Sequence, residues 1–145
     1  MSQTAQDELE ILRLVARLAQ ASDDRDEATY KACLATRISS GTPGLDEVTV
    51  SADVYSSASI ARLSLTDWTH HKLMNAIINV GEIRASASID CVVEVARSTQ
   101  GGQILRTTIG GRYQLEFVRT DGKWLINRRL MHRRYIDGHG PAVDA

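Results

Sequence analysis

The sequence predicts an α+β domain, with helices first and a curved, mostly antiparallel sheet after them. Helical periodicity dominates the first third, and from residue 71 onward long alternating segments are separated by short turns. Three helices folded across the concave face of such a sheet give a cone that encloses a pocket. The length of 145 residues predicts one domain over 1–145, with flexible tails at 1–6 and 139–145.

The first predicted helix carries a wide apolar stripe. Four residues follow the i, i+3, i+4, i+7 spacing of an amphipathic helix: Ile11, Leu14, Val15 and Leu18. Ser22 and Asp23 interrupt this pattern, so we expect the helix to end there.

Two shorter helices are expected next. Residues 24–26 (Asp-Arg-Asp) predict the polar start of a second helix, because acidic side chains suit the positive end of the helix dipole. This helix would carry Tyr30, Cys33 and Leu34. A loop at 39–44 follows, and a third helix is predicted over 56–65.

Strand patterns account for the rest of the chain. A first strand is predicted at 48–54, and four longer ones at 71–80, 83–97, 104–119 and 124–135. Asp121-Gly122 predicts a type I′ hairpin turn, in which both central residues need positive φ. Gly110-Gly111 in mid-strand predicts a bulge or a close backbone approach.

Bulk composition narrows the class of protein. The formal net charge is −1, which favours neither nucleic acid nor an anionic membrane as partner. The polar, acidic start does not resemble a signal peptide, and no apolar run approaches the roughly 20 residues that span a bilayer. Cys33 and Cys91 are interpreted as reduced core residues. A cytoplasmic location is therefore expected.

The sequence contains no motif typical of a metal-binding or nucleotide-binding site. The four histidines and two cysteines show no metal-ligand spacing. No glycine-rich loop follows a strand and opens a helix, as nucleotide binding would require. We expect a reaction that needs neither metal nor cofactor.

An aspartate and a histidine are the candidates for chemistry. Asp23 lies where the first two helices meet and could equally be a helix N-cap. His70 and His71 begin a strand and face opposite sides, and the bare pattern does not choose between them. A carboxylate beside an imidazole holds its tautomer and makes a general base that works near neutral pH.

Three stretches carry a family resemblance. They are 23–26 (DDRD), 69–75 (THHKLMN), and the late hairpin with 109–113 (IGGRY) and 121–124 (DGKW). Together they make residues 23–138 similar to the SnoaL-like branch of the NTF2-like superfamily, which includes scytalone dehydratase and hexachlorocyclohexane dehydrochlorinase. The resemblance implies the cone-shaped fold.

The resemblance also implies site residues. Asp23 and His71 match the pair that abstracts a proton in dehydratases and dehydrochlorinases. Arg129, five residues after the tryptophan of the hairpin, matches an arginine that could steady a developing anion. Leu18 stands where the dehydrochlorinase has a lysine, which argues against chloride removal as the specific reaction.

Six further side chains are candidate substrate-binding residues: Tyr30, Tyr55, Trp68, Asn75, Tyr113 and His132. The two earlier tyrosines could donate to a substrate carbonyl, although packing is the alternative for Tyr30. Trp68 is expected to cap the pocket or the core. Arg129 and His132 fall on opposite faces of a regular strand, so only a bulge would let both point inward.

The leading hypothesis is a cofactor-independent lyase or isomerase that abstracts a proton from a small apolar, cyclic molecule. The alternative is a non-catalytic ligand-binding protein, or the small subunit of a ring-hydroxylating dioxygenase. Because a partly apolar sheet face favours self-association, a homo-oligomer (dimer or trimer) is expected.

Overall fold

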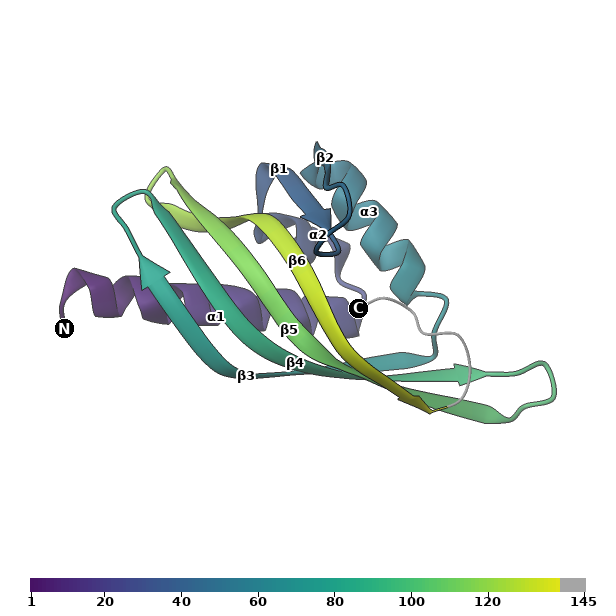
Figure 1. Ribbon diagram of the computed structural model, residues 1–145. Coiled ribbons are helices and arrows are strands. Elements are labelled where there is room, and N and C mark those ends of the chain that lie inside the picture. Colours follow the sequence, from purple (N-terminus) through teal and green to yellow (C-terminus); the bar gives the residue numbers. More distant parts are fainter. Residues whose placement is uncertain (139–145) are drawn as a thin grey trace.

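The computed structural model describes residues 1–138, in which three helices pack against a six-stranded sheet (Figure 1). The helices are α1 (Gln3–Asp24), α2 (Glu27–Ala32) and α3 (Ala52–Leu63). The strands are β1 (Leu34–Gly41), β2 (Val48–Ser51), β3 (Trp68–Val80), β4 (Arg84–Ser98), β5 (Ile104–Thr120) and β6 (Lys123–Gly138). Their order in the sheet is β2-β1-β6-β5-β4-β3, and of these neighbours only β1 and β6 run parallel. The predicted α+β class is confirmed.

Helix α1 is longer at both ends than predicted. It begins at Gln3, with the Ser2 hydroxyl capping the Ala5 amide, so the tail expected at 1–6 is wrong for residues 3–6. The tail expected at 139–145 lies outside the described residues. At its other end α1 continues through Asp24 and stops at Arg25, which adopts a left-handed conformation (φ 57°).

The short elements differ most from the predictions. Asp26, not Asp24, caps α2, and Cys33 ends that helix, so Leu34 opens a strand. Strand β1 was not predicted, because its Ser- and Gly-rich sequence resembles a loop, whereas pairing on both edges depends on backbone groups. The predicted strand at 48–54 stops at Ser51, whose hydroxyl caps the Val54 amide and starts α3 earlier than expected.

The long strands follow the predictions closely. β4 buries every second residue along most of its length, as the alternation indicated. The register of β5 and β6 shifts between Gly110 and Gly111, which confirms the bulge, and again between Glu116 and Phe117. Asp121 and Gly122 have φ of 51° and 77°, as the predicted turn requires.

The core lies between α1 and the inner face of the sheet. The apolar stripe of α1 joins alternating residues of β4 and β5 in one buried cluster. Cys33 and Cys91 are buried free thiols inside it, as predicted. None of the helices within residues 1–138 is long and apolar enough to cross a membrane.

A buried carboxylate fastens the start of α1 to the β5–β6 hairpin. Asp7 is only 3% exposed and accepts hydrogen bonds from Trp124 Nε1 (3.1 Å) and from the Arg119 guanidinium. The Arg119 guanidinium also lies over the Trp124 ring, 4.5 Å from its centroid. Trp124, at the β5–β6 hairpin, therefore anchors the start of α1 against the sheet.

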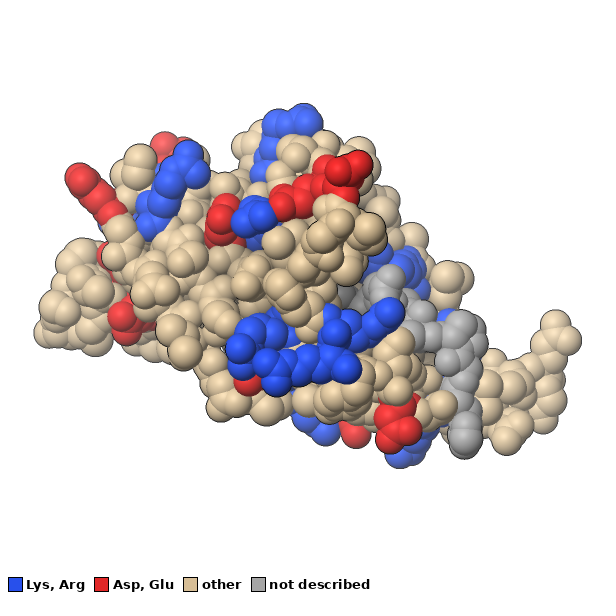
Figure 2. Space-filling view, viewed as in Figure 1, with Lys and Arg blue, Asp and Glu red and all other residues tan. Residues whose placement is uncertain are grey.

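The outer face of the sheet, which faces the viewer in Figure 1, is charged. Figure 2 shows Lys and Arg side chains gathered across the lower half of β5 and β6 on this face. Arg112 pairs with Asp90, and Arg128 pairs with Glu47 and Glu116.

The bulge at Gly111 should not tolerate a side chain. A Cβ there would lie 2.3 Å from the His132 carbonyl oxygen and 2.8 Å from the Met131 methyl group. Gly111→Ala is therefore expected to lower the free energy of unfolding in urea by about 1–3 kcal/mol. In the matched Gly101→Ala variant the nearest atom is Thr99 Oγ1 at 3.8 Å, so stability should stay within about 0.5 kcal/mol. Equal losses in both variants would contradict this account of the bulge.

Candidate active site

The last turn of α1 and the start of β3 bring Asp23 and His71 together. Asp23 Oδ1 lies 2.6 Å from His71 Nδ1, and Asp23 Oδ2 accepts the His71 backbone N–H at 3.0 Å. The His71 side chain is 3% exposed and that of Asp23 18%. A two-point contact between one carboxylate and one residue fixes both position and ring orientation.

Two neighbours hold the carboxylate in place. Thr69 donates its hydroxyl proton to Asp23 Oδ1 at 2.9 Å. The Arg25 guanidinium in turn donates to Thr69 Oγ1 and Thr66 Oγ1, both at 2.7 Å. Because Arg25 is also the left-handed residue that ends α1, the helix terminus and the strand are joined at the same point.

These contacts decide the charge of Asp23. Burial acts to raise the pKa of its carboxyl, but hydrogen bonds from the His71 ring and backbone and from Thr69 outweigh it and lower the pKa. An ionised carboxylate only accepts hydrogen bonds, so His71 Nδ1 must donate. In the neutral imidazole Nε2 is then the unprotonated nitrogen that can act as a base.

A partly buried arginine lines the same small pocket as His71. Arg129 donates to the hydroxyls of Tyr113 (2.8 Å) and Tyr55 (3.2 Å), and its guanidinium stacks over the Tyr113 ring at 4.4 Å. Burial acts to lower the pKa of Arg129, but interaction with the tyrosine oxygens raises it well above its ordinary value. Burial raises the pKa of Tyr113 as well. The guanidinium is therefore a permanent cation within the fold.

Two cavities meet at Arg129. The first, about 20 Å³, is lined mainly by apolar side chains of α1 and the sheet, with Ser22, His71, Tyr113 and Arg129 as its polar members. A second cavity of about 520 Å³ lies beside α3, the end of β1 and β6, and Arg129 and Tyr55 line it. The first holds about one water molecule, whereas the second has the size of a ligand site.

The model of the SnoaL-like domain matches residues 3–130, most of the chain. The chain belongs to the SnoaL-like family. No curated protein matches it in sequence.

Solved structures share the SnoaL-like fold over nearly their full length. The Kfla4162 protein of Kribbella flavida has a TM-score of 0.85 at 20% identity, covering 93% of this chain and 95% of that one. A candidate scytalone dehydratase from Novosphingobium aromaticivorans has a TM-score of 0.81 at 18% identity, covering 99% and 95%. The hexachlorocyclohexane dehydrochlorinase LinA-type3 of Novosphingobium barchaimii has a TM-score of 0.78 at 14% identity, covering 98% and 96%. At these identities the likeness shows the fold.

The three candidate tyrosines occupy different places in this SnoaL-like fold. Tyr30 is 2% exposed and stacks on Tyr55, with ring centroids 6.3 Å apart, and its burial raises its pKa to about 12. Burial acts to raise the pKa of Tyr55 too, but Arg129 outweighs it and lowers the pKa. Tyr55 lines the larger cavity and Tyr113 the smaller one, whereas Tyr30 lines neither.

Two sequence candidates lie away from the cavities. Trp68 is 38% exposed, lies under the Arg106 guanidinium and lines neither of the two cavities, so its capping role stays a prediction. Asn75 is exposed and donates to Asp90 at 3.0 Å. Regular alternation from His71 would place Asn75 on the face of His71, but β3 is irregular there: Asn75 has φ 53°, and the register shifts between Met74 and Ile77.

His132 lines the same cavity as Arg129, although the two side chains leave opposite faces of β6. The register of β6 is unbroken from Arg129 to His132, so the two side chains leave opposite faces of the strand. Both residues nevertheless line the larger cavity, because it lies at the edge of the strand where β1 ends. His132 Nε2 is buried and has no hydrogen-bond partner among residues 1–138.

Sequence reasoning missed two groups of residues. Arg25 and Thr69 lie inside the quoted motifs, but their shared role as supports of Asp23 depends on a contact 44 residues apart in sequence. Arg62 and Arg133, which line the larger cavity, carry no motif. Within residues 1–138 no three metal-binding side chains gather to form a metal site.

The lowered pKa of Asp23 predicts a pH-dependent contribution to stability. Because the folded pKa lies below the ordinary value of 3.8, stabilisation by the carboxylate is complete above that pH and is lost as the pH falls through the folded pKa. Urea unfolding should therefore show Asp23→Asn less stable than the wild type near about pH 6, with the difference shrinking below about pH 3. Asp24→Asn, an exposed change in the same turn, is the control. A difference that stays constant with pH would refute the prediction.

Proposed function

We propose that this protein is a cofactor-independent lyase or isomerase in which His71, oriented by Asp23, abstracts a proton from carbon. The observation that carries the proposal is the 2.6 Å contact between Asp23 Oδ1 and His71 Nδ1 at the wall of an apolar pocket. A carboxylate that fixes the imidazole tautomer is the usual arrangement for a general base near neutral pH. The dehydratase and dehydrochlorinase among the structural relatives support this class of reaction.

The proposed step needs only side chains of this chain. His71 Nε2 takes the proton, and the electron pair of the broken C–H bond moves toward an adjacent oxygen or expels a leaving group. Arg129 stabilises the negative charge that accumulates there. A positioned base contributes about 10²–10⁴-fold in rate, and one electrostatic donor about 10²–10³-fold. Return of the proton to another carbon gives isomerisation, and loss of the leaving group gives elimination.

Substrate binding must widen the pocket at His71. Its volume of about 20 Å³ is too small for an organic molecule, but it shares Arg129 with the cavity of about 520 Å³. We therefore place the body of the substrate in the larger cavity, with its reacting carbon inserted past Arg129 toward His71. Apolar walls such as Leu18 and Leu73 suit a hydrocarbon ring at that end.

Single substitutions of the pair test the base directly. Wild-type protein should accelerate deuterium exchange at the acidic carbons of 2-tetralone in D₂O, followed by NMR. His71→Ala and Asp23→Asn should each slow this exchange by at least about 10²-fold, because the base or its orientation is lost. His70→Ala, an exposed neighbour on the other strand face, should leave the rate unchanged. Full activity of both pair variants would leave a ligand-binding protein or a dioxygenase small subunit as the better interpretation.

A second pair of variants tests the anion-stabilising role. Arg129→Gln should slow the same exchange by about 10²–10³-fold, since the developing negative charge loses its cation. Arg128→Gln is the matched control, because Arg128 pairs with Glu47 and Glu116 on the other face of the strand. Similar rates for the two variants, with unfolding midpoints showing both folded, would exclude Arg129 from the step.

A further inference from the structure

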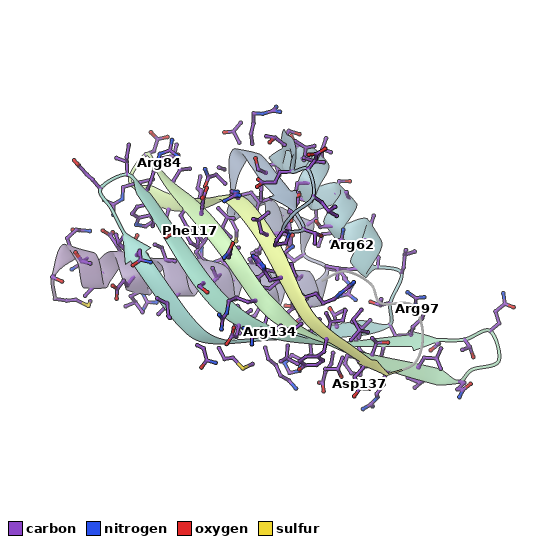
Figure 3. The ribbon with its side chains drawn as sticks, in the orientation of Figure 1. Arg62, Arg84, Arg97, Phe117, Arg134 and Asp137 are labelled. Atoms are coloured by element: carbon purple, nitrogen blue, oxygen red, sulfur yellow. The ribbon has the colours of Figure 1, made fainter. Side chains whose placement is uncertain are left out.

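The larger cavity is lined by cations from two sides. Arg62 comes from α3, and Arg129 and Arg133 come from β6, with His132 between them. None of the described residues that line it is an aspartate or a glutamate. Figure 3 labels Arg62 on α3.

We propose that this cavity binds the carboxylate of an organic acid, and that the substrate is therefore a small carboxylate-bearing molecule with an apolar body. This inference rests on the proposed function in one respect, because that function directs the apolar body toward His71. Arg62, Arg133 and His132 would hold the carboxylate in the ground state. Arg129, which lines both cavities, remains for the charge that forms near His71.

Two buried nitrogens can donate to an acceptor ligand, Arg62 Nε in every state and His132 Nε2 when it carries the proton. Arg62 Nε and His132 Nε2 are buried without a hydrogen-bond partner among the described residues. An unsatisfied buried polar group costs about 1–3 kcal/mol, so a ligand that supplies the missing partner gains that amount on binding. A carboxylate offers two acceptor oxygens to the planar guanidinium fork and several lone pairs in all.

Charge and size favour the same ligand. Three arginines around one volume repel each other, and an anion between them removes that repulsion while gaining attraction in a partly desolvated site. The cavity of about 520 Å³ admits a bicyclic acid. The far edge of its rings would enter the apolar pocket at His71, whereas a purely polar anion has no apolar part to place there.

Matched ligands test the charge preference. Calorimetric titration of the wild type should show 2-naphthoate binding at least about 10-fold more tightly than 2-naphthamide, which has the same shape without the charge. The preference should shrink as salt increases, because screening weakens the attraction. Equal affinities, or no binding of naphthoate, would overturn the proposal. Tighter binding of 2-naphthyl phosphate than of naphthoate would overturn the assignment to a carboxylate.

Matched variants locate the preference in the cavity. Arg62→Gln should weaken naphthoate binding about 10-fold and leave naphthamide unchanged. Arg133→Gln, an exposed position, should act in the same direction without affecting folding. Arg84→Gln is the control, since Figure 3 shows Arg84 at the opposite end of the sheet from Arg62. The site would be contradicted if Arg84→Gln lost affinity for naphthoate. It would also be contradicted if neither Arg62→Gln nor Arg133→Gln lost affinity.

The same titration in His71→Ala separates the two proposals. This variant should keep the preference for naphthoate, because His71 is not among the residues that line the larger cavity. A kept preference together with full proton-exchange activity would reject the catalytic proposal alone. If His71→Ala is inactive but the wild type shows no preference for naphthoate over naphthamide, only the carboxylate-binding proposal is rejected.

Discussion

The contact between Asp23 and His71 is the constraint on which the arrangement of the site depends. It requires α1 to end within one residue of the right place, because Asp23 lies in the last turn and Arg25 ends the helix. Burying a carboxylate is costly unless hydrogen bonds replace its water. Here the ring and backbone of His71 and the hydroxyl of Thr69 do so. The helix terminus and the first long strand are thereby held together by the group proposed for chemistry.

The same contact divides the polar groups by task. The donors around Asp23 keep it ionised and turn one nitrogen of His71 toward it, leaving the other available. Arg62, Arg133 and His132 line the larger cavity and not the pocket at His71. The proposed base and the proposed anion site therefore lie in two cavities that share Arg129 as a lining residue.

Periodic patterns predicted the long helix, the four long strands and the hairpin turn, because apolar spacing and special φ angles are local properties. The pairing of β1 with two neighbours was not predictable from its Ser-rich sequence, since it depends on backbone groups of distant segments. Asn75 was placed on the wrong face by assuming unbroken alternation through an irregular strand. Asp23 and His71 were found through the family resemblance, whereas Arg62 and Arg133 converge only in three dimensions.

The SnoaL-like fold does not by itself fix a substrate, since a candidate scytalone dehydratase and a hexachlorocyclohexane dehydrochlorinase both share it. What distinguishes members must then be the side chains that line the cavities. In this chain Leu18 makes the wall near His71 apolar, and Arg129 lines that pocket as well as the larger cavity. Arg129 would therefore stabilise the charge that forms near the base, whereas Arg62 and Arg133, which line only the larger cavity, would bind the end of the substrate that does not react. The positions of the charges therefore argue for recognition of an acid group remote from the reacting carbon.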